Sequence, residues 1–287
     1  MEVMNVKNIN MCECKIMTLA EQKQVMLGIL STFAEYCDTH NLRYYLDAGT
    51  LIGAVRHKGY IPWDDDIDVN MPQRDYYAFI KQMRKQNGHL SDNIIVEFSD
   101  ETLYPFLKIS DRRTIMIEFP HDNPMQVQVY IDVFPKFGIK DKSWRSKQVC
   151  NICYILGLWQ WFNVYTLKKW KRPNMELSKR IVGYILDAIN IYPHLPQKLQ
   201  EWFMLQYAKY HPLSECKYVT TLTNGEFHKL APKECFDGFQ WLEFEGMKFK
   251  GPKDFDTYLH CLYKGDYMQL PPENKRYHHK TEVYWKI

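Results

Sequence analysis

The acidic run from Trp63 to Val69 (WDDDIDV) constrains this chain more than any other segment. Ile67 and Val69 are β-branched and two positions apart, which is typical of a strand with one buried face. Asp66 and Asp68 alternate with them and would point together into a cleft. Two adjacent carboxylates repel each other unless a cation lies between them. Oxygen ligands without a nearby thiol or imidazole suit Mg²⁺ or Mn²⁺.

The residues before the acidic run add a second half to this site. Tyr44 to Asp47 is expected to form a short strand, Gly49 permits a tight turn, and Thr50 to Val55 can begin a helix. Backbone N–H groups at a helix start bind anions, so Gly49 and Thr50 are expected to receive phosphate. The order of strand, turn, short helix and acidic strand is that of polymerase-β-like nucleotidyltransferases.

Three other interpretations of the acidic run remain open. Asp64 to Asp68 fits the DDxxD motif of terpene and prenyl synthases, but that motif lies on a helix, and Pro62 with the β-branched alternation favours a strand. Asp66-x-Asp68 also fits the short DxD pattern of metal-dependent glycosyltransferases. The third is a solvated acidic turn or a calcium loop, although four carboxylates in five positions are costly to hold without a cation.

Residues 48–69, AGTLIGAVRHKGYIPWDDDIDV, resemble the signature of the LicD family, the phosphocholine transferases of bacterial surface glycans. This family is grouped with fukutin and the fukutin-related protein. Over twenty contiguous residues match, far more than a lone Asp-x-Asp. Residues 108–114 also resemble the family pattern KI-x-D-x-RT, and residues 263–278 resemble its closing YG-x-x-YM-x-x-P…H segment, with Lys264 inserted before Gly265.

A third carboxylate comes from the clearest alternating pattern in the chain. The odd positions from Val127 to Val133 are aliphatic and share one face, whereas Asp132 falls on the other. Nucleotidyltransferase-like sites need a carboxylate from a neighbouring strand to complete metal binding or to take the acceptor's proton. The segment IDVFP also resembles the LicD-family segment that carries this aspartate, so Asp132 is expected to fill that role.

Basic residues are expected to neutralise the donor phosphates. Positions 56–58 (RHK) lie in the loop between the Gly-Thr turn and the acidic strand, where ordinary solvated side chains are the alternative. The arginine pair at 112–113 offers a guanidinium that can fork onto a phosphate. The expected donor phosphate and nucleotide ligands are Gly49, Thr50, Arg56, Lys58, Lys108, Arg112 and Arg113.

The length of 287 residues suits one large domain, or a core with a helical appendage. The resemblance implies a single LicD-like domain over residues 1–287. Residues 18–140 would form the nucleotidyltransferase-like core, 141–212 a helical insert, and 213–287 a hairpin and helix that complete the fold. The fold class is α+β, a mixed β-sheet flanked by helices. The net charge of +3 is too mild for a nucleic-acid-binding protein.

Local patterns predict further elements. Thr18-x-x-Glu21 is a capping box, and the helix after it is expected to bury a face that includes Leu19. Another helix is expected to start at Met71-Pro72. Two more are expected at residues 178–190 and 196–210. Short strands are expected at residues 106–109, 114–117 and 218–222, and a hairpin is expected to turn at Glu245-Gly246.

The chain is expected to be cytoplasmic. Its start lacks a signal-peptide pattern, and the longest apolar stretch, residues 152–167, is interrupted by Gln160 and Asn163. The eight cysteines are therefore expected to be reduced thiols. Helical periodicity from Val149 to Phe162 indicates a buried helix with a solvated basic end at residues 168–172. The alternative is an amphipathic helix in peripheral contact with the inner face of the membrane, which would bring the enzyme to a lipid-linked glycan.

The resemblance implies transfer of phosphocholine, or a similar phospho-alcohol, from CDP-choline or another CDP-alcohol to a sugar hydroxyl of a glycan acceptor, with release of CMP. Asp66 and Asp68 would hold Mg²⁺ or Mn²⁺ on the donor, and Asp132 would complete the metal site and act as base. A nucleotidyltransferase or a DxD glycosyltransferase can use the same three carboxylates. A non-catalytic metal- or nucleotide-binding protein would bind without turnover.

Overall fold

The computed structural model describes residues 14–99, 102, 104–118, 125–165, 177, 181, 185, 195–276 and 281–287. Its main sheet consists of β1 (Cys14–Ile16), β2 (Tyr45–Leu46), β3 (Asp68–Pro72), β4 (Ile94–Glu97), β5 (Leu107–Glu118), β6 (Met125–Ile139), β7 (Tyr218–Thr220), β8 (Ala231–Pro232) and β11 (Thr281–Lys286). The strand order is β1-β11-β5-β6-β3-β2, with β4 beside β5, and β7 and then β8 beyond β6. Only β3 and β6 pair in parallel within this sheet. The predicted α+β fold with a mixed sheet is confirmed.

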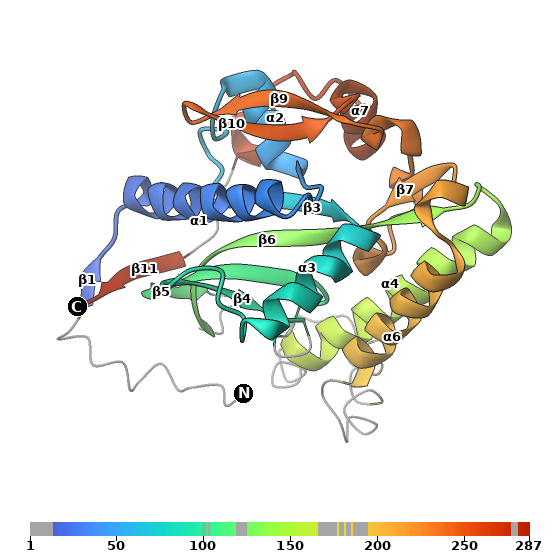
Figure 1. The fold of residues 1–287 in the computed structure, drawn as a ribbon, viewed down its shortest axis with the longest axis horizontal. Coiled ribbons are helices and arrows are strands. Elements are labelled where there is room, and N and C mark those ends of the chain that lie inside the picture. Colours follow the sequence, from blue (N-terminus) through green and yellow to red (C-terminus); the bar gives the residue numbers. More distant parts are fainter. Residues whose placement is uncertain are drawn as a thin grey trace.

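Helices α1 (Leu19–Thr39) and α3 (Gln73–Lys85) pack against the sheet (Figure 1). The predicted capping box starts α1: the Thr18 hydroxyl accepts from the N–H of Glu21, and the Glu21 carboxylate accepts from the N–H of Thr18. The first residue of α1, Leu19, was expected on the buried face but is exposed. The burial of α1 begins at Gln22, one turn further on.

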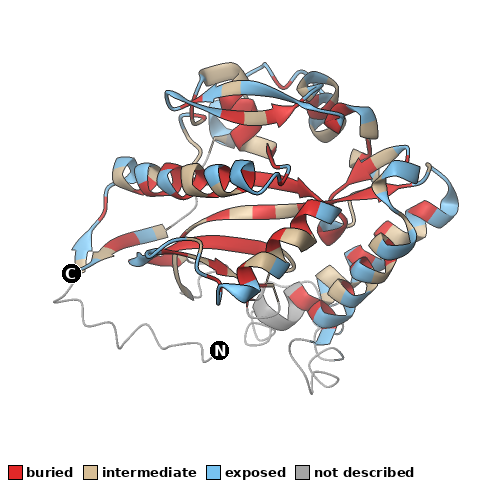
Figure 2. Cartoon of the chain, viewed as in Figure 1, coloured by how far each residue is buried: buried red, intermediate tan, exposed pale blue. Residues whose placement is uncertain are grey.

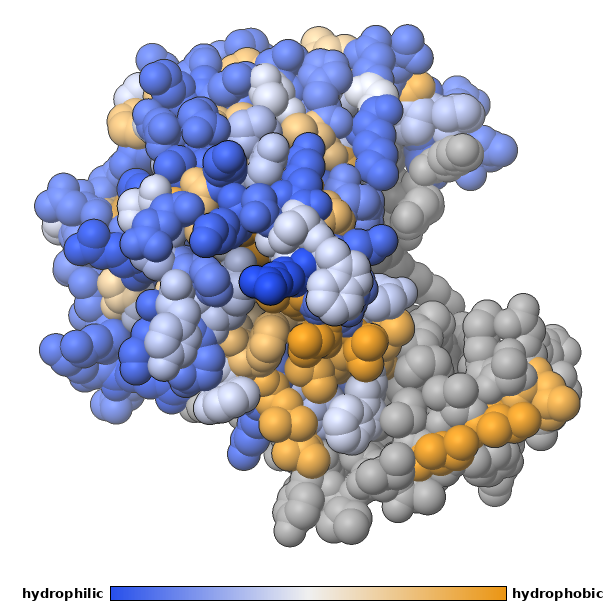
Figure 3. Space-filling view, turned by 90° about the vertical axis from the view of Figure 1, so that its right-hand side faces the viewer, coloured by the Kyte–Doolittle hydropathy of each residue, from blue (hydrophilic) through white to orange (hydrophobic). Residues whose placement is uncertain are grey.

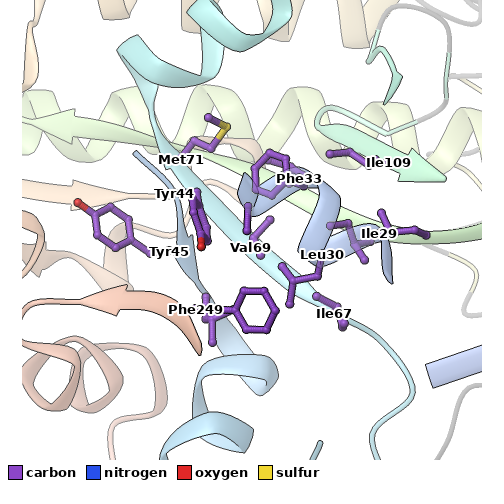
Figure 4. Packing of buried hydrophobic residues seen from close by; sticks show 14 of the residues in the cluster. Ile29, Leu30, Phe33, Tyr44, Tyr45, Ile67, Val69, Met71, Ile109 and Phe249 are labelled. Carbon is purple, nitrogen blue, oxygen red and sulfur yellow. The ribbon is translucent and has the colours of Figure 1, made fainter. Parts of the chain in front are cut away.

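The core lies between these helices and the sheet. Phe33 of α1 contacts Tyr44 and Phe79 edge to face, each with ring centroids 5.5 Å apart. Ile67 and Val69 are fully buried in the same cluster (Figure 4), as their alternation predicts. Figure 2 shows the buried residues running along α1 and the central strands. Burying these side chains fixes which face of the strand at 66–69 is left for Asp66 and Asp68.

A second layer covers the start of β3. It consists of α2 (Ala48–His57), the hairpin β9 (Phe239–Phe244) and β10 (Met247–Pro252), and α7 (Phe255–Tyr263), grouped above α1 in Figure 1. The predicted hairpin turn at Glu245-Gly246 is confirmed, with φ of 51° and 75° at the two residues. The Glu245 N–H donates to the Lys58 carbonyl (2.8 Å), and its carboxylate accepts from the Tyr60 N–H (3.0 Å). The hairpin therefore holds the loop that leads into the acidic run.

Two strand predictions were wrong in their limits. Residues 106–109 and 114–117 were expected to form two strands, but both belong to β5, which continues through an irregularity between Asp111 and Met116. Strand β3 begins at Asp68, so Asp66 lies in the loop before it. The helix expected from Met71-Pro72 begins one residue later, and Gly88, with φ of 79°, follows its end. Pairing partners from distant segments set these limits.

The helical insert contributes α4 (Trp144–Tyr165) and α6 (Leu195–Tyr210). Cys150 and Cys153 of α4 are buried, but Ile152 and Ile155 are exposed, so α4 is not buried all round. Figure 3 shows apolar residues gathered on this side of the molecule. Of the expected helix at 178–190, only residues 181 and 185 are described, and both are helical; the basic segment 168–172 lies outside the described residues. Among those that are described, no helix is both long and apolar enough to cross a bilayer, and Cys14, Cys37, Cys150, Cys153, Cys216, Cys235 and Cys261 are free thiols.

Short 3₁₀ turns join the elements of the last third of the chain. They are η4 (Leu213–Glu215), η5 (Leu222–Asn224), η6 (Phe227–Lys229), η7 (Lys233–Phe236) and η8 (Glu273–Lys275). Strand β7, which the sequence places within residues 218–222, pairs with the end of β6, and β11 pairs with β5. The segment 213–287 therefore adds strands to the same sheet that carries the acidic residues.

Candidate active site

Charged side chains form one row across five adjacent segments of the sheet. Asp68 of β3 lies directly opposite Asp132 of β6, and Asp132 lies opposite Lys108 of β5. The row continues at one end to Glu97 of β4 and at the other to Asp47, whose N–H donates to the Asp68 carbonyl (3.0 Å). Residues directly opposite each other share a face of the sheet. The fold thus brings Asp132 beside Asp68, although 64 positions separate them.

The start of α2 borders this row. Asp47 caps the helix, because its carboxylate accepts from the Ala48 N–H (2.9 Å). It also pairs with the ammonium of Lys136 (2.9 Å) and accepts from the Tyr258 hydroxyl, and it is buried. Ala48 has a φ of 43°, a strained conformation for a residue with a side chain. These bonds hold the first turn of α2 against the carboxylates.

Gly49 and Thr50 lie in this first turn, which corrects the predicted tight turn at Gly49. Their N–H groups are among those that an α-helix cannot satisfy internally, so the anion-binding argument still applies. The Thr50 hydroxyl accepts from the N–H of Asp68 (2.8 Å) and is buried, so this side chain fixes the start of β3. A Cβ on Gly49 would lie 2.6 Å from Oδ2 of Asp64. Gly49 therefore gives the Asp64 carboxylate room at the helix start.

The carboxylates raise one another's pKa. Burial, followed by the charges of Asp66, Asp132, Asp47 and Asp64, raises the pKa of Asp68 well above its usual value. Burial also raises the pKa of Asp132 to about 6, although Lys108 opposes the shift. The pKa of Asp64 is raised to about 7 by burial and by Asp66, to which it is hydrogen-bonded. The acidic groups are therefore close enough to disfavour their charged forms.

This repulsion predicts a pH-dependent stability in the absence of divalent cations. An aspartate with a raised pKa keeps in the folded state a proton that the unfolded chain releases near pH 4, so stability falls as pH rises from about 4 through about 7. We expect the thermal midpoint in EDTA to be higher at pH 5 than at pH 8. Differential scanning fluorimetry with and without Mg²⁺ measures this. A cation bound by these carboxylates should reduce the difference, and an unchanged difference would contradict cation binding here.

Gly49→Ala should reduce activity without reducing stability. The added Cβ displaces the Asp64 carboxylate, which is the end of a flexible side chain, so the fold need not adjust. We expect the thermal midpoint to stay level or rise slightly, since alanine favours a helix, and kcat/KM to fall about tenfold. Gly28→Ala in α1 is the matched control, because nothing lies within 4 Å of its added Cβ. Equal activity of both variants would show that the position of the Asp64 carboxylate does not affect catalysis.

Among the basic residues predicted for the site, Lys108 forms an ion pair with a carboxylate of the row, that of Asp132. Its ammonium lies 2.8 Å from Oδ1 of Asp132 and is buried. Three rings surround it, with centroids 3.2 Å (Tyr130), 4.1 Å (Tyr104) and 5.6 Å (Phe106) away. The rings and Asp132 fix the position of this charge, which lies beside the carboxylates and not in solution.

The other predicted cations lie farther from the row. Arg56 is in the last turn of α2, where its guanidinium donates to the carbonyls of Tyr267 (2.7 Å) and Gln269 (3.3 Å). Lys58 ends this helix in a left-handed conformation, with φ of 61°. The helix start, not its end, adjoins Asp68, so one helix length separates these two residues from the carboxylates.

Arg112 and Arg113 are not brought to the carboxylates. They follow Lys108 along β5 by four and five positions, about 13–17 Å at the usual rise of a strand. Arg113 forms a two-pronged ion pair with Asp111 (2.6 Å), and the Arg112 carbonyl accepts from the Lys286 ammonium (2.6 Å). The sequence pattern does not show that β5 extends beyond Lys108 and carries both arginines away from the carboxylates.

Sequence reasoning missed several residues that adjoin the row. Asp47 follows a strand and precedes a helix, so the N-cap rule marks it. Lys136 is four positions beyond Asp132 on the same face of β6, but its contact with Asp47 needs the sheet register. Arg276 stacks on Trp63, with its guanidinium carbon 4.7 Å from the ring centroid. Arg276 thus places a cation from a distant segment of the chain beside Trp63, at the start of the acidic run.

The donor set suits a divalent cation in its chemistry. The acidic groups near Asp68 offer carboxylate oxygens only, and their raised pKa values show a repulsion that a cation relieves. No three His, Cys, Asp or Glu side chains in the described part of the chain already converge as a metal site. Side-chain rotation would therefore have to accompany binding.

Comparisons with known proteins agree with this geometry. Residues 41–152 match the family model described as LicD/FKTN/FKRP, nucleotidyltransferase domain. The lipopolysaccharide cholinephosphotransferase LicD of Haemophilus influenzae is 30% identical over 286 residues, which span 94% of this chain and 99% of that protein. The ribitol 5-phosphate transferase FKRP of Mus musculus is 23% identical over 130 residues, 45% of this chain and 23% of that protein. Because the similarity to the bacterial protein extends over nearly the whole of both sequences, the chain belongs to the LicD family.

Proposed function

We propose that this protein transfers a phospho-alcohol, phosphocholine in the first instance, from a CDP-alcohol to a sugar hydroxyl of a cell-surface glycan precursor. The observation that supports this most is the register that places Asp68 directly beside Asp132 at the start of α2. The full-length similarity to a lipopolysaccharide cholinephosphotransferase supports the phospho-alcohol as the transferred group. The shorter similarity to a ribitol 5-phosphate transferase supports the same class of chemistry.

In this proposal Asp66, Asp68 and Asp132 would hold Mg²⁺ or Mn²⁺, which would supply positive charge against the donor diphosphate. The first-turn N–H groups of Gly49 and Thr50 donate to phosphate oxygens and stabilise the charge that builds up during transfer. Lys108 adds a fixed positive charge at Asp132. Arg56, Lys58, Arg112 and Arg113 belong to a wider set of candidate donor ligands that would need movement to reach the phosphates.

The reaction breaks one P–O bond and makes another. The acceptor hydroxyl oxygen attacks the distal phosphorus, the bond from that phosphorus to the bridging oxygen breaks, and CMP leaves with this oxygen. The hydroxyl proton passes to the Asp132 carboxylate. The Lys108 ammonium contacts Oδ1 of this carboxylate (2.8 Å) and orients it.

We place the reaction at the inner face of the membrane, on a lipid-linked acceptor. The support is the apolar residues gathered on the face shown in Figure 3. Ile155 of α4 and Trp202 of α6 are each 61% exposed. The enzyme would be a cytoplasmic protein in peripheral contact with lipid. Nucleic acid is not among the proposed partners.

Release of the nucleotide product tests the function. The protein is incubated with Mg²⁺ or Mn²⁺, an extract of lipopolysaccharide or teichoic acid, and one donor at a time. We expect CMP from a CDP-alcohol, phosphate incorporated into the glycan, and loss of both in EDTA. Pyrophosphate released from a nucleoside triphosphate would instead identify a nucleotidyltransferase, and UDP or GDP from a nucleotide-sugar a glycosyltransferase. Metal binding without release from any donor would favour a non-catalytic protein.

A further inference from the structure

A cavity of about 960 Å³ lies apart from the carboxylate row. It is enclosed by the start of α3, the end of α6, and the turns η4 and η7. Its floor includes the buried residues Gln73 and Phe236, with Tyr77 on one wall. We name it the basic cavity after four of its lining residues, Arg43, Arg74, Lys209 and Lys233.

The charges around the basic cavity are not balanced. Arg43 pairs with Asp75 (2.6 Å), but Arg74, Lys209 and Lys233 have no carboxylate partner among the residues that the structure describes. The Lys233 ammonium donates to the Ser214 carbonyl (3.3 Å). Asp237 is the one acidic residue of the lining. Like charges around a shared hollow repel each other, and an anion bound between them removes that cost.

Two short chains of contacting residues lie between the carboxylate row and the cavity. Pro72 lines it and lies four residues along β3 from Asp68, about 13 Å away. Phe236 also lines it, and its ring packs on Tyr258 with centroids 5.0 Å apart. The Tyr258 hydroxyl donates to Asp47, at the end of the row. A ligand in the cavity is therefore within one oligosaccharide's reach of the reacting phosphate, but too far to be that phosphate.

We infer that the basic cavity binds an anionic sugar of the acceptor glycan, a sugar that carries phosphate or carboxylate. This inference rests on the proposed function and names the chemical class of its acceptor. The cations that line the cavity meet the anionic group, and the half-buried Tyr77 adds apolar surface for a sugar ring. The occupied cavity fixes the glycan so that another hydroxyl, some 13 Å away, points at the donor.

The first test is direct binding and needs no turnover. Isothermal titration calorimetry with glucose 6-phosphate, and with glucose as the uncharged reference, is run on the wild type and on Arg74→Gln/Lys209→Gln. Lys81→Gln is the matched control, because Lys81 lies on the same helix as Arg74 but does not line the cavity. We expect the sugar phosphate to bind about tenfold more weakly to the double variant and equally to the control. Equal binding to all three proteins, or equal binding of glucose, overturns the inference.

The second test separates acceptor from donor. In the transfer assay, Arg74→Gln/Lys209→Gln should raise the acceptor KM about tenfold and leave the donor KM and kcat unchanged. A rise in the donor KM instead would show that the cavity serves the nucleotide, and the acceptor assignment would fall. If no transfer occurs with any donor, the proposed function fails, while the calorimetry still decides whether the cavity binds an anionic sugar.

Discussion

Asp68→Asn is expected to reduce transfer at least about thousandfold and at the same time to stabilise the protein. The loss of activity follows because Asp68 lies between Asp47 and Asp132 in the row, beside the start of α2, and feels the charges of four acidic neighbours. The gain in stability follows because the substitution removes a buried charge that its neighbours disfavour. Product release gives the first result, and thermal denaturation in EDTA at pH 8 gives the second.

Two further variants test whether the effects of Asp68→Asn come from its place among the other carboxylates. Asp92→Asn, at an exposed residue away from the row, should leave both quantities unchanged. Asp132→Asn should lower activity as strongly as Asp68→Asn but stabilise less, because the buried ammonium of Lys108 loses its partner. If Asp68→Asn keeps more than a tenth of the activity, the carboxylate row is not the catalytic centre.

Lys136→Met is expected to destabilise the fold by about 3–5 kcal/mol. Lys136 and Asp47 are both buried and 2.9 Å apart, and the lysine also donates to the Thr221 hydroxyl (2.8 Å). Removing the ammonium leaves the Asp47 carboxylate charged, without its counter-ion and away from water. For a chain of this size we expect the thermal midpoint to fall by roughly 10 °C.

A second substitution should restore part of this loss. In Asp47→Asn/Lys136→Met the buried charge is gone, and an asparagine still caps α2. The matched control is Lys229→Met, whose pair with Glu226 is partly exposed, and we expect it to cost less than about 1 kcal/mol. Equal midpoints for Lys136→Met and Lys229→Met would show that the buried pair adds no more than a surface pair.

The local features of the site are readable from the sequence, and the contacts across the sheet are not. Alternation at 66–69 predicts which side chains enter the core, and the structure buries Ile67 and Val69 as expected. The capping box and the Glu245-Gly246 turn depend on neighbouring residues and are also confirmed. Each of these predictions needs only steric and hydrogen-bonding rules that act within a few positions.

The positions and contacts that the sequence does not reveal share one physical cause. The positions of Arg112 and Arg113 depend on how far β5 extends beyond Lys108, and Lys136 meets Asp47 only because of the order and register of the strands. Gly49 looked like a turn residue, whereas the space it provides is filled by Asp64. Spacing in sequence carries no information on these approaches, because strand pairing between distant segments decides them.

The hydrogen bonds from the β9–β10 hairpin to the loop before the acidic run affect how the protein folds during synthesis. Tyr60 and Glu245 are bonded across 185 positions, and β11 enters the sheet beside β5. A ribosome that has delivered residues 48–69 has made α1 and β2, but not β6, the hairpin or β11. Such long-range closure is slow compared with helix formation. The growing polypeptide would carry its acidic residues in an unassembled form, unable to bind donor, until the last strand of the sheet emerges.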